Sequence, residues 1–278
     1  MRGLRRAALY YSRSAMQRIK TILARTPALA FGASPPVRFI VLSRSRSGTN
    51  LLLEMLNAHR NVLAFGEVFQ QLNGRAASEV LEEIRRPTAF FIKALGFKIF
   101  YYHPLDRPAP ELWDALSADF SLRIIHLRRH NRLETKLSHA LATRSNRWAQ
   151  RVGEKPSGPL AKVYLDPDEM RREFESMAAQ EAECSKRFEN HRVFDLRYED
   201  LFVDGPRQFG RVCRFLDVPA PRPTPPPGLV KQTRSTPDQI IGNFEALREH
   251  FLGTPWADYF EPANFSHNIL KDRLAREA

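Results

Sequence analysis

A short polar turn between an apolar run and a helical pattern carries residue types that suit anion binding. Residues 37–42 (VRFIVL) read as a buried strand and residues 51–58 as a helix. A turn from a strand into a helix points successive backbone N–H groups at a phosphate. The turn offers a flexible glycine, side-chain hydrogen-bond donors and one positive charge, in the order Arg46, Ser47, Gly48, Thr49, Asn50. The sequence therefore predicts a phosphate-binding loop.

This turn differs from the loop of nucleoside triphosphatases. Their pattern is G-x-x-x-x-G-K-[ST], in which the lysine and the hydroxyl serve the phosphates and Mg²⁺. Here Ser43 replaces the first glycine, and Thr49 and Asn50 occupy the lysine and hydroxyl positions. The substitutions disfavour ATP–Mg²⁺ chemistry.

A second basic turn follows another predicted strand, residues 122–127 (LRIIHL), and precedes a helix at about 131–149. Arg128 and Arg129 stand where that strand ends, which is where parallel sheets bind their ligands. An arginine at the strand tip and Ser138 on the following helix can hold one phosphate between them. The sequence predicts a second anion site here.

Glu67 follows the apolar run 62–65 and is flanked by Phe65, Val68 and Phe69. A carboxylate among apolar side chains is partly desolvated, which suits a general base that removes a hydroxyl proton near neutral pH. Composition alone does not separate this role from that of a surface or helix-capping glutamate.

Strands and helices alternate along the chain and predict a parallel sheet covered on both faces. Further strands are expected at 96–101 and 192–196. Further helices are expected at 76–86, 111–117, 167–190 (N-capped by Asp166), 206–216 and 237–250. Polar or proline-rich loops are expected at 150–164 and 218–228. We predict one α/β domain at 36–265, with a central parallel sheet flanked by helices, a basic N-terminal extension at 1–35 and a tail at 266–278.

Composition restricts the class of protein. The chain has 278 residues, 43% hydrophobic and 27% charged, which excludes collagen-like, coiled-coil and wholly disordered chains. Its net charge of +12 indicates anionic partners. Cys184 and Cys213, the two cysteines, show no zinc-binding spacing, so we expect no metal and a reducing compartment. The chain has no apolar run long enough to span a membrane. The basic extension is either an amphipathic helix touching an anionic membrane surface or a loosely packed leader.

The first turn resembles the 5′-phosphosulfate-binding loop of sulfotransferases that use 3′-phosphoadenosine 5′-phosphosulfate (PAPS). That loop reads [Lys/Arg]-Ser-Gly-[Thr/Ser] and requires no metal, and Arg46-Ser47-Gly48-Thr49 matches it. Arg129 and Ser138 resemble the family's 3′-phosphate element, an arginine followed by a serine eight residues later. The spacing here is nine, so Arg128 stays an alternative for the 3′-phosphate.

The same resemblance implies roles for further residues. Glu67 matches an acid in the (Gly/Pro)-Glu-x-Phe-like context of bacterial and carbohydrate sulfotransferases, where it acts as the base. Lys98 and His103 resemble a segment near the family's active site and are the alternatives for that base. Lys231 precedes Gln232 as in bacterial members, and could reach the cofactor's phosphate or the acceptor.

The resemblance predicts an enzyme that moves a sulfuryl group from PAPS to a hydroxyl, on a sugar or glycolipid, by in-line transfer. Arg46 would stabilise the leaving phosphate and Glu67 would take the proton. No nucleic-acid partner is expected, and the lack of an anchor helix suggests a cytoplasmic enzyme. Two alternatives are a nucleotide-dependent kinase, which needs a lysine after Gly48 and an acidic metal ligand, and a basic nucleic-acid-binding protein, which needs a reader element beside its basic patch.

Overall fold

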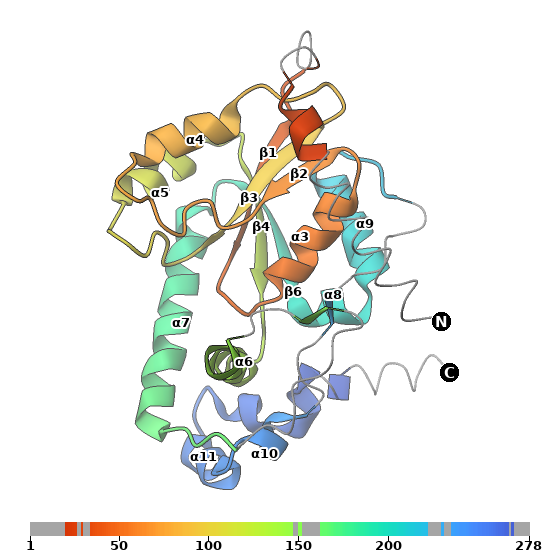
Figure 1. Cartoon of the computed structure of the whole chain (residues 1–278). Coiled ribbons are helices and arrows are strands. Elements are labelled where there is room, and N and C mark those ends of the chain that lie inside the picture. Colours follow the sequence, from red (N-terminus) through yellow and green to blue (C-terminus); the bar gives the residue numbers. More distant parts are fainter. Residues whose placement is uncertain are drawn as a thin grey trace.

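The sheet has five parallel strands. A computed structural model describes residues 20–26, 29, 34–146, 150–151, 162–221, 229–230, 235–266 and 268–269. The strand order is β2-β3-β1-β4-β6 (Figure 1). The bounds are β1 (Val37–Ser43), β2 (Val62–Phe65), β3 (Ala94–Phe100), β4 (Arg123–Arg128) and β6 (Arg192–Arg197), with a separate two-residue pair of β5 (Gln150–Arg151) and β7 (Leu229–Val230). The central strands are continuous apolar runs because helices cover both their faces.

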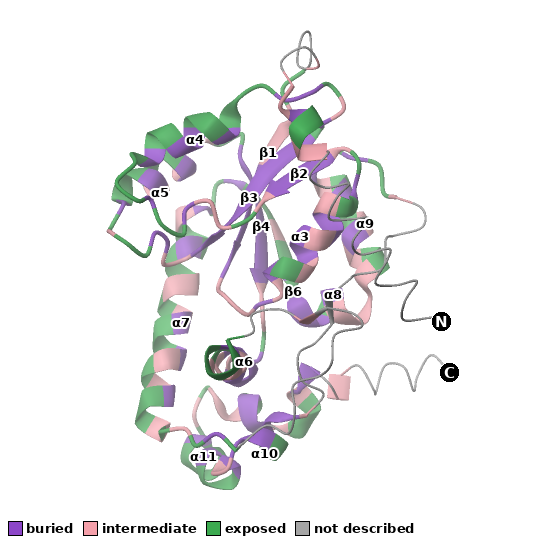
Figure 2. Cartoon of the chain, viewed as in Figure 1, coloured by how far each residue is buried: buried purple, intermediate pink, exposed green. Residues whose placement is uncertain are grey.

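Helices form a layer on each side of the sheet. One face packs on α3 (Thr49–Ala58), α8 (Tyr198–Val203) and α9 (Gly205–Phe215). The other packs on α4 (Ala77–Arg85), α5 (Pro110–Ser117) and α7 (Pro167–Arg187), which Asp166 caps as predicted. Figure 2 shows the buried sheet between these layers. The predicted α/β class with a central parallel sheet is confirmed.

A third group of helices lies below the carboxyl ends of the strands in Figure 1. It comprises α6 (Arg132–Ser145), α10 (Pro237–Ile240), α11 (Phe244–Phe251) and the 3₁₀ turns η1 (Ala257–Phe260) and η2 (Pro262–Asn264). A core of its own, which includes Leu133, Phe174 and Phe251, joins these helices to α7. The group thus places α6 beside the strand ends.

The prediction of one helix at 237–250 is wrong, because the chain leaves the helix between Ile240 and Phe244. Ile241 forms a parallel bridge to Val163, and the N–H of Gly242 donates to the Val163 carbonyl at 2.8 Å. Asn243 Nδ2 donates to the Leu165 carbonyl at 2.7 Å. These tertiary bonds replace the helical ones. Residues 198–203, which were not predicted as a helix, form α8.

Candidate active site

The two predicted phosphate turns lie side by side because β1 and β4 are neighbours in the sheet. Ser43 Oγ, at the end of β1, donates to the Leu127 carbonyl of β4 at 2.5 Å. After β1 the chain forms β2 and β3, which lie toward one edge of the sheet. It then forms β4, which pairs with β1 on the opposite side. Such a switch point is where open α/β sheets bind ligands.

The first turn has the backbone shape of an anion-binding loop. Gly48 has φ +87° and Arg46 has φ +67°, both in the left-handed region. A Cβ on Gly48 would lie 2.4 Å from Cδ2 of Tyr198, so only glycine fits beneath that ring. Gly48 begins α3, and no side chain of the described residues caps the helix there. The N–H groups at the start of α3 therefore face an anion position.

Arg46 and Ser138, predicted to hold different phosphates, contact each other: Arg46 Nε donates to Ser138 Oγ at 3.0 Å. Burial lowers the pKa of Arg46, and the nearby charge of Arg129 lowers it further, against the opposite effect of Tyr198. Two guanidinium groups held this close favour a bound anion.

Arg129 is almost completely enclosed, with 6% of its side chain exposed. Its Nη2 lies 3.0 Å from Glu134 Oε2, and its guanidinium stacks 4.8 Å over the Tyr198 ring. Burial lowers the pKa of Arg129, but Glu134 and the other acids nearby outweigh it, so the pKa is raised overall. Glu134 also accepts bonds from the N–H and the hydroxyl of Ser266. Much of the charge of Arg129 is thus compensated inside the protein.

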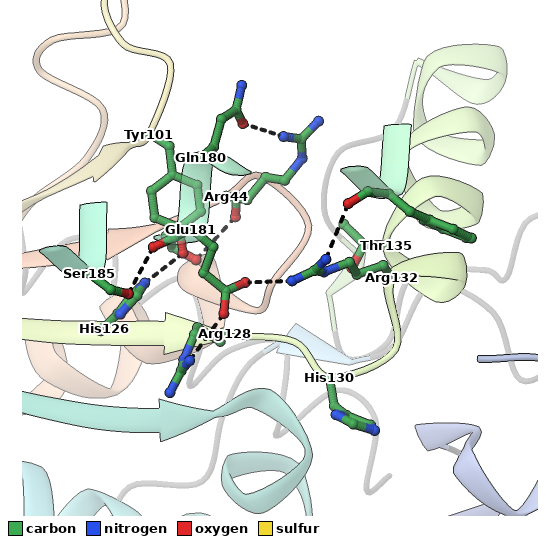
Figure 3. Close-up of polar contacts among 12 residues, drawn as sticks. Arg44, Tyr101, His126, Arg128, His130, Arg132, Thr135, Gln180, Glu181 and Ser185 are labelled. Carbon is green, nitrogen blue, oxygen red and sulfur yellow. Dashed lines mark hydrogen bonds and ion pairs between the residues drawn. The ribbon is translucent and has the colours of Figure 1, made fainter. Parts of the chain in front are cut away.

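Arg128, the alternative, is directed elsewhere. It forms ion pairs with Glu181 of α7 at 3.1 Å and with Asp195 of β6 at 2.8 Å. Figure 3 shows Glu181 between Arg128 and Arg132. Arg129, in contrast, donates from Nη1 to the carbonyl of Arg46 at 3.4 Å. Of the two arginines, Arg129 is the one joined to the first turn.

Glu67 faces basic groups. Its Oε1 lies 2.8 Å from Lys98 Nζ and its Oε2 lies 3.7 Å from His103 Nε2. Lys98 also donates to Asn50 Oδ1 at 2.6 Å, which links the loop, β3 and the segment after β2. Phe69 is buried in the hydrophobic core, and Phe65 and Val68 are partly buried against it. The polar contacts of Glu67 come instead from Lys98 and His103.

His103 is a neutral neighbour of Glu67. It is 2% exposed, and its Nδ1 accepts from the N–H of Phe100 at 3.3 Å. The ring proton is therefore assigned to Nε2, which points toward Glu67. Burial lowers the pKa of His103 to about 4, although Glu67 opposes that shift. Lys98 is thus the cationic partner of Glu67, and His103 is not poised to accept a proton at Nε2.

These groups line one cavity of about 660 Å³. Its inner wall holds Arg46, Thr49, Asn50, Glu67, Lys98 and His103, and its outer wall holds Arg44, Tyr102, Lys136, His139, Glu173, Met177 and Gln180. The outer wall comes mainly from α6 and α7. The cavity therefore brings a cationic anion-binding loop and a carboxylate to one solvent-accessible space.

The outer wall was not predicted. Arg44 Nη1 donates to Gln180 Oε1 at 2.6 Å, as Figure 3 shows, and its guanidinium lies 5.5 Å from the Tyr102 ring centroid. Lys136 Nζ lies 2.8 Å from a Glu173 oxygen. The i, i+3 spacing of Lys136 and His139 on a predicted helix was the available signal. Lys231, predicted as a cofactor ligand, lies outside the described residues.

The amino-acid sequence is similar to nodulation protein H of two rhizobia. The Rhizobium meliloti protein is 28% identical over 242 residues, which cover 83% of this chain and 97% of that protein. The Rhizobium tropici protein is 27% identical over 238 residues, with 81% and 94% covered. No family model matches the chain.

Solved structures that resemble this one include the sulfotransferase domain from the curacin biosynthetic pathway and a mouse sulfotransferase complexed with PAP. The first is 16% identical with a TM-score of 0.42, covering 88% of this chain and 99% of that chain. The second is 16% identical with a TM-score of 0.39, covering 90% and 87%.

Tyr198, at the start of α8, lies against both phosphate turns. Its ring lies between the Gly48 backbone and the Arg129 guanidinium. Glu199, next in sequence, accepts from the N–H of His130 in the turn after β4. The described part of the chain has no helix long and apolar enough to cross a membrane.

Proposed function

We propose that this protein is a sulfotransferase that moves a sulfuryl group from PAPS to a hydroxyl of a sugar or glycolipid, with Glu67 as general base. The observation that supports this best is the chain of contacts from Asn50 through Lys98 to Glu67. It joins the anion-binding loop to a carboxylate in the same cavity, so a donor on the loop and an acceptor at Glu67 would meet.

The residues fit a donor with two phosphate positions. Ser47, Gly48, Thr49 and Asn50 offer the start of α3 to the 5′-phosphosulfate. Arg129 and Ser138 are assigned to the 3′-phosphate. The Nε of Arg129 is buried and has no hydrogen-bond partner among the described residues, so a donor remains for an anion. Lys231 is a further candidate for the phosphate or the acceptor.

PAPS supplies the sulfuryl group when it is bound. In the proposed step a bond forms between the acceptor oxygen and sulfur, while the bond from sulfur to the phosphate oxygen breaks. Glu67 takes the hydroxyl proton. Arg46 and the loop N–H groups stabilise the negative charge that develops on the leaving phosphate oxygen, and Lys98 holds the Glu67 carboxylate in place.

The outer wall of the cavity is assigned to the acceptor. The lining there includes the polar side chains of Lys136, Glu173 and Gln180 and the aromatic ring of Tyr102. A few placed polar groups in a larger cavity fix the orientation of a small molecule, and this composition suits a hydroxyl-rich acceptor. Cys184 and Cys213 are free thiols, which suits the cytoplasmic location that we propose.

The decisive experiment measures binding and transfer separately. We expect 3′,5′-adenosine bisphosphate to raise the melting temperature, and ATP–Mg²⁺ and an oligonucleotide to raise it less. We expect labelled sulfate from PAPS to appear on an oligosaccharide or glycolipid acceptor. Stabilisation by ATP–Mg²⁺ alone would favour the kinase alternative, and stabilisation by the oligonucleotide alone the nucleic-acid alternative.

A further inference from the structure

A second cavity lies away from the reaction cavity, between the N-terminal segment and α4. It measures about 850 Å³, within the roughly 300–1,000 Å³ typical of small-molecule sites. We call it the N-terminal cleft. It is lined by Thr21, Arg25, Phe65, Val68, Arg75, Val80, Glu83, Ile84, Arg86 and Pro87.

The N-terminal segment is fixed to the domain where it borders this cleft. Lys20 Nζ donates to the carbonyls of Asn57 and Val62 at 2.6 and 2.7 Å. Arg25 donates to the carbonyls of Ile84 and Arg86, both at 3.0 Å. These bonds join residues 20–26 to α3, β2 and the end of α4, so the cleft is built from several elements.

The floor of the cleft is apolar. Phe65 ends β2 and Val68 lies in the segment after it, and Val80 and Ile84 come from one face of α4. Removing such an apolar surface from water is favourable, so an apolar ligand would bind there. An aliphatic chain has the shape and chemistry for this floor.

The rim of the cleft carries unbalanced positive charge. Glu83 is the one acid among the lining residues, and it pairs with Arg75 at 2.8 Å. Arg25 and Arg86 also lie close together: burial lowers the pKa of Arg25 and the charge of Arg86 lowers it further, against the opposite effect of Glu83. An anion between these two guanidinium groups would relieve their repulsion.

We propose that the N-terminal cleft binds a long-chain aliphatic carboxylate, with its hydrocarbon chain on the apolar floor and its carboxylate at Arg25 and Arg86. The inference does not depend on sulfuryl transfer, since binding needs no nucleotide. Phe65 and Val68 flank Glu67, so the cleft and the reaction cavity share one segment.

The test is calorimetric titration of the full chain with laurate, decanoate and octanoate below their micelle concentrations. We expect one site, with affinity falling about fourfold for each methylene removed. Dodecyltrimethylammonium, which has the same chain and the opposite charge, should bind at least tenfold more weakly than laurate. Equal affinity for both twelve-carbon ligands, or no laurate binding, would overturn the proposal.

Variants locate the site. Arg86→Ala should weaken laurate binding about tenfold, and Val68→Trp, which fills the floor, should weaken it more. Arg85→Ala is the matched control, because the neighbouring Arg85 pairs with Asp119 at 3.1 Å and does not line the cleft. Far-ultraviolet circular dichroism and a cooperative thermal transition verify that each variant is folded. Unchanged laurate binding in Arg86→Ala and Val68→Trp would place the ligand elsewhere and refute the assignment.

Discussion

Glu67 and Lys98 form an ion pair in a cavity that also holds the anion-binding loop. The Lys98 ammonium, 2.8 Å away, holds this carboxylate in a fixed orientation, and a general base must be held within reach of the proton that it removes. Glu67→Gln keeps the shape and removes the basicity. We expect sulfuryl transfer to fall by about 10²–10⁴-fold, measured as kcat with saturating donor, while affinity for 3′,5′-adenosine bisphosphate stays within about twofold.

Glu111→Gln is the control for that change, because Glu111 also pairs with a basic side chain, Arg107 at 3.0 Å, but does not line the cavity. It should leave kcat within about tenfold of the wild type. Full activity in Glu67→Gln, or parallel loss of nucleotide affinity and rate, would show that the base lies elsewhere, with Lys98 and His103 as the next residues to change.

Arg46 is expected to act mainly on charge that appears during transfer. Arg46→Ala should therefore lower kcat more than it lowers donor affinity, by at least about tenfold in the ratio of the two effects. Steady-state kinetics with varied PAPS concentration measure both. An unchanged kcat would mean that Arg46 does not act on the transition state and serves only as a hydrogen-bond donor to Ser138.

At the scale of elements, the sequence predicted the strands well and the surroundings of the site poorly. β1, β3 and β4 are recognisable because strands buried on both faces are continuous apolar runs. The break between α10 and α11 depends on a bridge to Val163, which is remote in sequence. No local sequence pattern could therefore indicate it. Lys98 reaches Glu67 only because β2 and β3 pair in parallel, with Phe65 opposite Phe97. The cationic surroundings of Glu67 follow from that register.

The junction of the loop with α3 and α8 gives a prediction about backbone shape. Gly48→Ala combines a left-handed φ, which is unfavourable by about 1–2 kcal/mol for a residue with a Cβ, with a collision against Tyr198. We expect it to lower the free energy of unfolding by more than 2 kcal/mol and to abolish stabilisation by 3′,5′-adenosine bisphosphate. Urea denaturation with and without the nucleotide measures both.

Gly74→Ala is matched to this change, since Gly74 has φ +78° but nothing within 4 Å of an added Cβ. Gly74→Ala should lose only the part of the free energy of unfolding that the left-handed φ causes, and it should keep nucleotide binding. Equal losses of stability in the two variants would mean that the Tyr198 contact is unimportant.

At the scale of the whole molecule, two buried histidines couple folding to pH. Burial, more than any charge nearby, lowers the pKa values of His103 and His126 to about 4 each. His126 Nε2 lies 2.7 Å from the Tyr101 hydroxyl, as Figure 3 shows. The unfolded chain takes up protons on both rings near pH 6.5, whereas the folded chain does not until about pH 4. Stability is therefore fully present above pH 6.5 and falls as the pH drops toward 4.

This linkage yields a prediction for His126. Between pH 7 and pH 5 each histidine should reduce the free energy of unfolding by about 2 kcal/mol, from about 1.4 kcal/mol per pH unit below 6.5. His126→Gln can keep a hydrogen bond to Tyr101 but has no ring to protonate, so its loss of stability over that interval should be about 2 kcal/mol smaller than in the wild type. His130→Gln, at an exposed position, should keep the wild-type pH dependence. Urea denaturation at pH 7, 6 and 5 measures all three proteins, and an identical pH dependence in His126→Gln and the wild type would contradict the burial of a neutral imidazole between β4 and α7.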